Sequence, residues 1–460
     1  MERKLAWNEY SPEALEALNA LSERYKDFLY NGKTERECVT RTVELAKAKG
    51  YADLTERVKS GKALVPGEKL YYAYMGKCVM LFIAGEKPME EGLSIIGAHI
   101  DSPRLDIKQN PLYEDTGFAY LDTHYYGGIK NFQWVTMPLA LHGVVVKKDG
   151  TAIELAIGED ENDPVFCITD ILPHLGHDQM GKTAGSFIPG ESLDVMIAGS
   201  PLKDEEKEPV KALALKLLTE KYGFEEEDLL SAELEVVPAG KPRDLGLDRS
   251  MILGYGHDDR VCAYAQVEAM FSIDTVPART VACILTDKEE IGSVGATGMR
   301  ARYFENAIAE LMHLNGEDGD LKLRRCLAAS AMLSCDVSAG YDPMFGGCFD
   351  KKNAAFLGKG VCFNKYTGSR GKSGSNDANA EFMAKCRAIM DEGGVMFQTA
   401  ELGKVDQGGG GTIAYICALY GMNVIDSGVA VLSMHAPWEV ISKADLYESF
   451  KAYREFALKA

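Results

Sequence analysis

The sequence has 460 residues, of which 46% are hydrophobic and 26% are charged, a balance typical of a globular protein. Its 50 Lys and Arg residues stand against 69 Asp and Glu residues, so the formal net charge is −19. Such an acidic chain argues against nucleic acid or an anionic membrane as the main partner. The eleven cysteines form no CxxC pair, and we find neither a signal peptide nor a membrane-length apolar run. We therefore expect a cytoplasmic protein.

The first hundred residues are predicted to form two helices followed by buried strands. Ser11 and Pro12 mark the start of a helix, and apolar residues at helical spacing continue to Phe28. Thr34 and Glu37 form a capping box at the start of the second helix. The apolar stretches that we predict as strands are 70–85 and 92–102.

From about Pro111 to Lys241 the pattern changes. The stretch 139–160 predicts a β-hairpin that turns at Asp149-Gly150, and the charged stretch 201–230 predicts a solvated helix with a loop. This part lacks the alternation of strands and helices seen elsewhere. We therefore interpret 111–241 as an inserted, β-rich second domain.

After Asp244, strand and helix patterns alternate again, which is typical of an α/β fold. We expect a mixed, mostly parallel sheet sandwiched by helices, built from 1–110 and 242–460. The predicted strands are 279–286, 327–338, 395–400 and 423–437, and the predicted helices are 375–394, 412–421 and 442–458.

Polar residues that follow these buried strands are the candidates for chemistry. In open α/β sheets, sites gather at the carboxyl ends of the strands. Two histidines with several carboxylates form a mixed set of nitrogen and oxygen ligands that suits Zn²⁺, Mn²⁺ or Co²⁺. The candidate ligands are His99, Asp258, Glu290, Asp336 and His435.

Five ligands hold two metals if one carboxylate bridges them at a separation of about 3.5–4 Å. We assign His99 and Asp336 to one metal, Glu290 and His435 to the other, and Asp258 as the bridge. Each motif alone is more often a structural histidine, a loop or a solvated pair. Their combination in one α/β half favours the metal site.

The adjacent glutamates in "TDKEEIGS" have separable roles. Neighbouring residues of an extended segment point to opposite sides, so Glu290 is a ligand while Glu289 faces the reactive water as general base. Asp101 stands two residues beyond His99, on the same strand face. We expect Asp101 to hold the imidazole by its free N–H.

Two loops are further candidates for binding. Lys365 and Lys372 belong to a basic, glycine-rich loop that either receives a carboxylate or is an ordinary surface loop. The run "GKVDQGGGGTIAY" places four glycines before a helix, but it contains no Walker motif, which argues against a nucleotide site.

Taken in order, "GAHIDSPR", "GHDDR", "TDKEEIGSVGATG", "SCDVSAGYDP" and "SMHAPWEV" resemble the aspartyl-aminopeptidase family of dinuclear metallopeptidases, over nearly the whole chain. The resemblance implies a zinc-exopeptidase type of fold, two divalent metal ions, most often zinc, and the same ligands, with Glu289 as base and Asp101 in support. It implies removal of N-terminal residues from peptides with a free N-terminus. It also implies dimers formed through the inserted domain, and a dodecamer of these dimers.

The same resemblance implies that the glycine loop lines the peptide site, although close chain packing explains the glycines equally well. The residues so implied are Asp406, Gly410 and Gly411, with backbone N–H groups up to Thr412. Aspartyl-preferring relatives carry a histidine after the glycine run of the insertion, whereas this chain reads "GGIKNFQW". In this respect the sequence resembles the bacterial branch of the family more closely. The missing histidine puts a strict preference for acidic N-terminal residues in doubt.

Two other functions remain open. A metal-dependent deacylase or carboxypeptidase-type hydrolase uses a similar metal core, and differs by accepting substrates without a free α-amine. An assembly that binds peptides without turnover needs no general base, so the presence of Glu289 beside Glu290 argues against it.

Overall fold

The computed structural model describes residues 4–460, which form two compact units. The first unit runs to Asp101 and continues with Pro242–Met434 and Glu439–Ala460. The second unit consists of Ser102–Lys241 together with the short segment His435–Trp438. The sequence-based boundaries were 110/111 and 241/242, so the first of them lies several residues later than the structural division.

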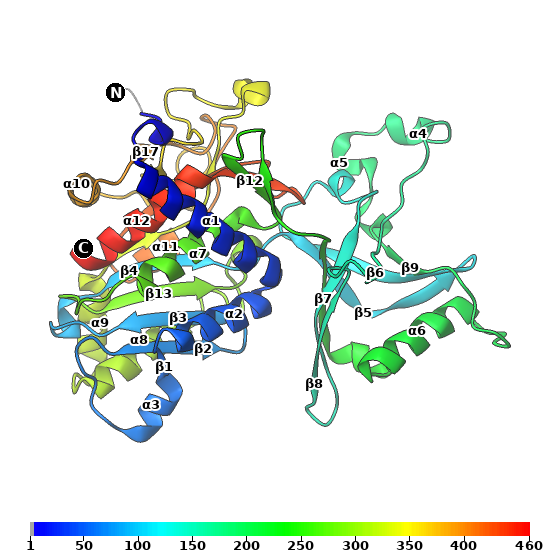
Figure 1. The fold of residues 1–460 in the computed structure, drawn as a ribbon, viewed down its shortest axis with the longest axis horizontal. Coiled ribbons are helices and arrows are strands. Elements are labelled where there is room, and N and C mark those ends of the chain that lie inside the picture. The colour runs from blue at the N-terminus through cyan, green and yellow to red at the C-terminus, as the bar shows by residue number, and fades with distance from the viewer. Residues whose placement is uncertain (1–3) are drawn as a thin grey trace. The chain divides into compact units, whose positions relative to one another are not determined.

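A nine-stranded sheet forms the centre of the first unit. Four adjacent strands in its middle are parallel to one another (Figure 1). The next strand on each side of these four runs antiparallel to its neighbour. This is the mixed, mostly parallel sheet that the sequence predicts. In spatial order its strands are β1 (Ala52–Asp53), β2 (Lys69–Tyr74), β3 (Cys78–Ile83), β13 (Val281–Thr286), β4 (Ser94–His99), β14 (Ala331–Ser334), β18 (Asn423–Gly428), β16 (Val361–Asn364) and β17 (Phe397–Thr399).

Helices cover both faces of this sheet, because its strands are apolar on both sides. In β3, Val79 and Leu81 pack into one core, whereas Met80 and Phe82 pack into the other, as the two-residue period of a strand requires. The first core includes α1 (Pro12–Asn31), α2 (Glu35–Ala48), α7 (His257–Phe271), α10 (Ala380–Glu392) and α12 (Lys443–Lys459). The second includes α3 (Leu54–Ser60), α8 (Tyr303–Leu314), α9 (Asp320–Ala329) and α11 (Ala414–Ala418).

The helix starts predicted from the sequence are confirmed. The Ser11 side chain accepts the N–H of Ala14 at the start of α1, and Thr34 and Glu37 form the capping box of α2. The helix predicted at 412–421 is shorter, since α11 is a single turn. The stretch predicted at 70–85 is a hairpin of β2 and β3 rather than one strand.

The strand predicted at 423–437 is wrong in its extent. It ends as β18 at Gly428, and the chain continues as β19 (Ala430–Leu432) in a different sheet. Gly428 allows the crossing, because a Cβ there would lie 1.8 Å from the backbone oxygen of Asp336. This second sheet also contains β11 (Arg243–Leu245), β12 (Met251–Gly254), β15 (Ser338–Ala339) and β20 (Glu439–Ser442).

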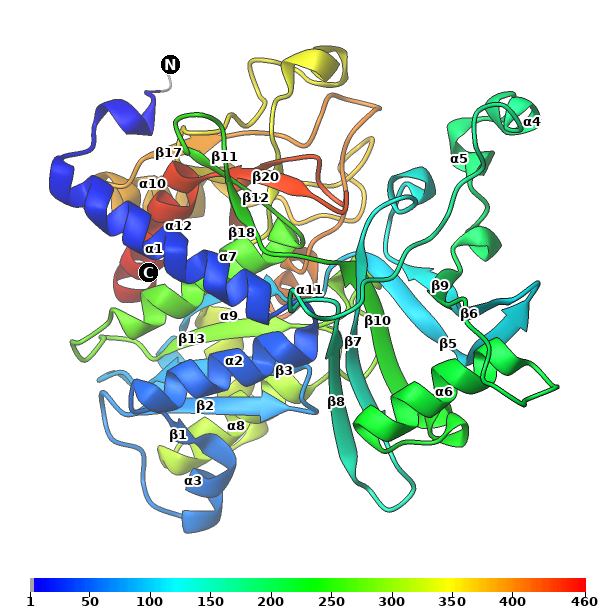
Figure 2. The same cartoon turned by 45° about the vertical axis from the view of Figure 1, so that its right-hand side comes forward.

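The second unit has a six-stranded antiparallel sheet, and α6 (Pro209–Tyr222) packs against β5, β6 and β9 (Figure 2). The predicted hairpin at 139–160 is present as the β7–β8 pair. In spatial order the strands are β8 (Ala152–Ile157), β7 (Leu139–Val146), β10 (Ala232–Pro238), β5 (Arg104–Asp115), β6 (Phe118–Tyr126) and β9 (Val195–Ala198), and the short helices are α4 (His177–Met180) and α5 (Ala184–Phe187).

Within residues 4–460, no helix combines the length and the apolar character needed to cross a bilayer.

Candidate metal centre

Three parallel neighbours, β13, β4 and β14, end at the same edge of the large sheet. Thr286 pairs with His99, and Ser334 pairs with Gly97 in the strand register. Residues just beyond β13 and β14 therefore stand level with the end of β4. This register brings the segment after Thr286, which carries Glu289 and Glu290, to the same edge as His99 and Asp336.

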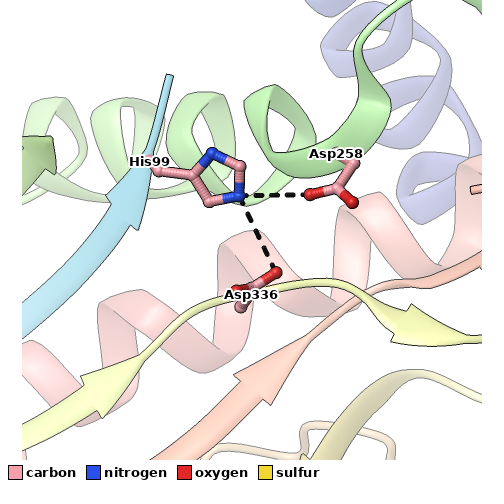
Figure 3. A group of neighbouring side chains, drawn as sticks. All are labelled: His99, Asp258 and Asp336. Atoms are coloured by element: carbon pink, nitrogen blue, oxygen red, sulfur yellow. Dashed lines mark hydrogen bonds and ion pairs between the residues drawn. The ribbon is translucent and has the colours of Figure 1, made fainter. Parts of the chain in front are cut away.

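His99 and two carboxylates form the first cluster (Figure 3). Its Nε2 atom lies 3.1 Å from an oxygen of Asp258 and 3.9 Å from an oxygen of Asp336. The His99 and Asp258 side chains are 2% and 5% exposed, and that of Asp336 is 13% exposed. One imidazole nitrogen thus faces two carboxylates, and all three side chains are largely buried.

The electrostatic environment of this first cluster favours a bound positive charge. Burial alone would lower the pKa of His99, yet its contacts with Asp101 and Asp258 raise it well above the usual value. Burial, then the nearby charge of Glu289, raises the pKa of Asp336 well above its usual range. A divalent cation bound among these nitrogen and oxygen donors would offset the crowded negative charge, so the donor set fits a metal ion.

Asp101 connects the first cluster to the paired glutamates. Nδ1 of His99 lies 3.0 Å from the backbone oxygen of Asp101 and 3.2 Å from its carboxylate, and the second of these is the contact expected from the sequence. The same carboxylate accepts the backbone N–H groups of Glu289 and Glu290, each at 3.2 Å. One fully buried side chain therefore fixes the imidazole at the end of β4 and the turn that follows β13.

The two glutamates lie in a 3-10 turn, Glu289–Ile291, rather than in the extended segment assumed from the sequence. Successive residues of such a turn point about 120° apart, so the pair still diverges, for a different geometric reason. Glu290 joins the second cluster, whereas the charge of Glu289 acts on Asp336. Lys288, with φ of +65°, turns the chain at this point.

Ligand atoms of Asp258, Glu290 and His435 form the second cluster, within 4.8 Å of one another. His435 stands in the short connection from β19 to β20. Asp258 belongs to both clusters, and its backbone N–H donates to Glu439 at 3.0 Å. Sequence reasoning missed Glu439, an acid four residues after His435 whose burial only the structure shows.

His257 stands next to Asp258 but belongs to neither cluster. Its Nδ1 lies 2.6 Å from the hydroxyl of Tyr25, and its Nε2 lies 3.2 Å from the backbone oxygen of Ile252. Complete burial lowers its pKa to about 3, so the ring is neutral and structural.

Five residues proposed from the sequence to bind substrate belong to neither cluster: Lys365, Lys372, Asp406, Gly410 and Gly411.

A single carboxylate pairs with both lysines and offsets one of their two positive charges. Lys365 and Lys372 pair with Asp377 at 2.6 and 2.9 Å, and these pairings lower the pKa of Asp377. Lys372 and Asp406 line a cavity of about 340 Å³ between the loops 366–372 and 401–408. The basic loop therefore presents less free positive charge than its sequence suggests.

The comparisons with known proteins agree with this geometry. The family model described as aminopeptidase I zinc metalloprotease (M18) matches residues 28–457. A probable M18 family aminopeptidase 1 of Clostridium acetobutylicum is 56% identical, over 99% of this chain and 98% of the relative.

Solved structures show the same fold. The crystal structure of an M18 family aminopeptidase from Thermotoga maritima is 44% identical, with a TM-score of 0.95 and complete coverage of both chains. The mApe1 dodecamer of S. cerevisiae is 20% identical, with a TM-score of 0.77 over 96% of this chain and 97% of that chain. Two clusters of candidate metal ligands that share Asp258, and a family match over nearly the whole length, lead to one conclusion: the chain belongs to the M18 family of zinc metalloprotease aminopeptidases.

Proposed function

We propose that this protein removes N-terminal residues from peptides at a dinuclear metal centre. The observation that carries the proposal is the sharing of Asp258 by two groups of ligand atoms. His99 and Asp336 would hold one ion, Glu290 and His435 the other, and Asp258 would bridge them. The bound ions would polarise the scissile carbonyl and supply a water of lowered pKa.

Glu289 is the proposed general base. It follows the buried strand β13 beside the proposed ligand Glu290, and it is half-buried. It takes the proton of the attacking water and passes it to the leaving amine. Asp101 keeps this turn fixed through the N–H groups of Glu289 and Glu290.

We propose Zn²⁺ as the resident ion, with Mn²⁺ and Co²⁺ as alternatives that accept the same ligands. The family description as a zinc metalloprotease supports zinc. A cytoplasmic location accords with eleven free cysteines, all within the described residues.

Self-association into dimers and a dodecamer is also proposed, with the insertion, expected at 111–241, as the dimerisation and substrate-gating domain. Support comes from the yeast relative solved as a dodecamer. Measurement of mass in solution tests this part, and a monomer at micromolar concentration would exclude it.

The test of the activity is hydrolysis of a panel of aminoacyl and peptide substrates by metal-stripped protein, after addition of Zn²⁺, Mn²⁺ or Co²⁺. Each substrate has an N-acetylated control. Metal-restored turnover of free amines alone supports the aminopeptidase. Turnover of the acetylated controls would instead establish a deacylase or carboxypeptidase-type hydrolase, and metal binding without turnover a peptide-binding assembly.

A further inference from the structure

A buried carboxylate, Asp426, lies on β18 directly beside the strand that leads to Asp336. It pairs with Ser334 of β14 in the parallel register, and only 2% of it is exposed. Its Oδ1 atom accepts two hydroxyl groups, that of Thr412 at 2.6 Å and that of Ser334 at 3.2 Å. Its Oδ2 atom has no hydrogen-bond partner among the described residues. Burial of such a group is costly, which indicates a role beyond filling space.

Thr412 ends the glycine run. Its side chain is buried, whereas Gly409, Gly410 and Gly411 are exposed. The Thr412 hydroxyl also accepts a hydrogen bond of 3.2 Å from the N–H of Ala414, the first residue of α11. Glycines impose little conformational preference, so the Thr412 side chain helps to set the path at the end of the run, beside the backbone packing of Gly409 against Gly368.

The backbone donors of this run are not equivalent. Gly410 donates its N–H to Thr367 at 3.2 Å. By contrast, within residues 4–460 the N–H groups of Gly411 and Thr412 donate to no backbone carbonyl. The sequence-based interpretation treated the N–H groups from Gly410 to Thr412 alike, whereas Gly410 is the one of the three that donates to a backbone carbonyl.

Asp426 therefore connects the glycine run to the metal-binding edge. Ser334 precedes Asp336 by two residues, and the charge of Asp426 is one of those that act on Asp336. A displacement of the Thr412 hydroxyl would move the N–H groups of Gly411 and Thr412 relative to the end of β14.

We propose that Asp426 is a positioning residue for the peptide substrate. It holds Thr412 so that the N–H groups of Gly411 and Thr412 donate to a carbonyl oxygen of the bound peptide. The inference rests on the proposed aminopeptidase function. It adds that the loop binds the substrate through a peptide carbonyl group.

The test compares Thr412→Val, which removes the hydroxyl at nearly constant volume, with Thr412→Ser, which keeps it. Ser334→Ala is the matched control, because it removes the other hydroxyl from the same oxygen and leaves the loop tied. We expect Thr412→Val to raise KM for a peptide substrate roughly tenfold, the effect of one lost hydrogen bond of about 1.4 kcal/mol. Thr412→Ser and Ser334→Ala should stay within about twofold of the wild type.

Limited trypsin digestion of the metal-loaded protein supplies a readout that is independent of turnover. Cleavage after Lys404 should be faster in Thr412→Val than in Thr412→Ser or Ser334→Ala, since the glycine run has lost its tie. Metal content, measured by mass spectrometry, should be unchanged in all three variants. Thr412→Ala replaces the valine variant if the latter does not fold.

An unchanged KM and cleavage rate in Thr412→Val would overturn the inference. An equal rise of KM in Ser334→Ala would do so too, because it would indicate a general loss of stability. If the wild-type protein turns over no peptide with any metal, the proposed function itself has failed. Wild-type turnover with an unaffected Thr412→Val removes the inference alone.

Discussion

The strand ends that carry the metal cluster and the glycine-rich loops differ in how firmly their side chains are held. His99 is buried, and carboxylates contact both of its ring nitrogens. Lys365 and Lys372, in contrast, are exposed side chains with 44% of their surface accessible, and both depend on Asp377. His99, a proposed metal ligand at the end of β4, is thus held by buried contacts, whereas the two lysines proposed to contact substrate are held by one exposed carboxylate.

The largest effect is expected at Glu289. Glu289→Gln removes the proposed base but leaves all five proposed ligands, so kcat should fall roughly a thousandfold with metal content unchanged. Steady-state kinetics and metal analysis of the same samples measure both quantities, with Glu310→Gln as a surface control. Loss of metal in Glu289→Gln would show that Glu289 is itself a ligand.

The next largest difference is expected between two of the buried histidines, His99 and His257. His99→Ala removes one nitrogen ligand, so at least one equivalent of metal should be lost, with turnover reduced more than a hundredfold. His257→Gln should keep both metals and lower only stability, because His257 contacts Tyr25 and Ile252 instead. Metal analysis with thermal unfolding distinguishes them, and full metal content in His99→Ala would contradict the assignment.

A smaller effect is expected at Asp101. Asp101→Asn preserves the shape of the side chain but weakens its hold on His99 and on the turn of Glu289. Metal affinity should fall roughly 10- to 100-fold, as for other residues that orient a ligand. Competition with a chelator measures the affinity, and an unchanged value would mean that Asp101 is dispensable for metal binding.

The smallest effect is expected in the loops. Asp377 pairs with both Lys365 and Lys372, so Asp377→Ala releases both side chains and raises the local net charge by one unit. KM for substrates with an acidic N-terminal residue should fall a few-fold relative to neutral substrates, in line with the weakness of exposed ion pairs. Asp377→Asn, which removes the same charge but keeps the shape of the side chain, is the matched variant for comparison. An unchanged ratio of the two KM values would place these lysines outside the substrate site.

Much of the metal centre was predictable from local sequence. His99 and Asp336 directly follow apolar strands, and residues in that position of an α/β sheet reach its carboxyl edge. Asp258 is the second residue of α7, two positions after Gly256, and this glycine-rich helix start also marked it as a candidate. The alternation of strands and helices predicted the sheet, because buried parallel strands are apolar on both faces.

Other features depend on contacts between residues distant in sequence. The end of β18 at Gly428 depends on its approach to Asp336, and no local pattern records that approach. Asp426 and Glu439 looked like ordinary acids until the strand pairing placed them beside Ser334 and Asp258. The basic loop looked free because Asp377, a few residues further along, was not considered as its partner.

The sequence by itself determined which residue types stand at the ends of buried strands, and with them the chemistry of nitrogen and oxygen ligands. Only the tertiary structure decided that Asp258 is shared by two clusters, that Glu289 and Glu290 diverge from a 3-10 turn, and that His257 is structural. The physical reason is the separation in sequence between the residues that interact. Apolar periodicity and caps are local, whereas strand register and the pairing of buried charges are set by residues a hundred or more positions apart.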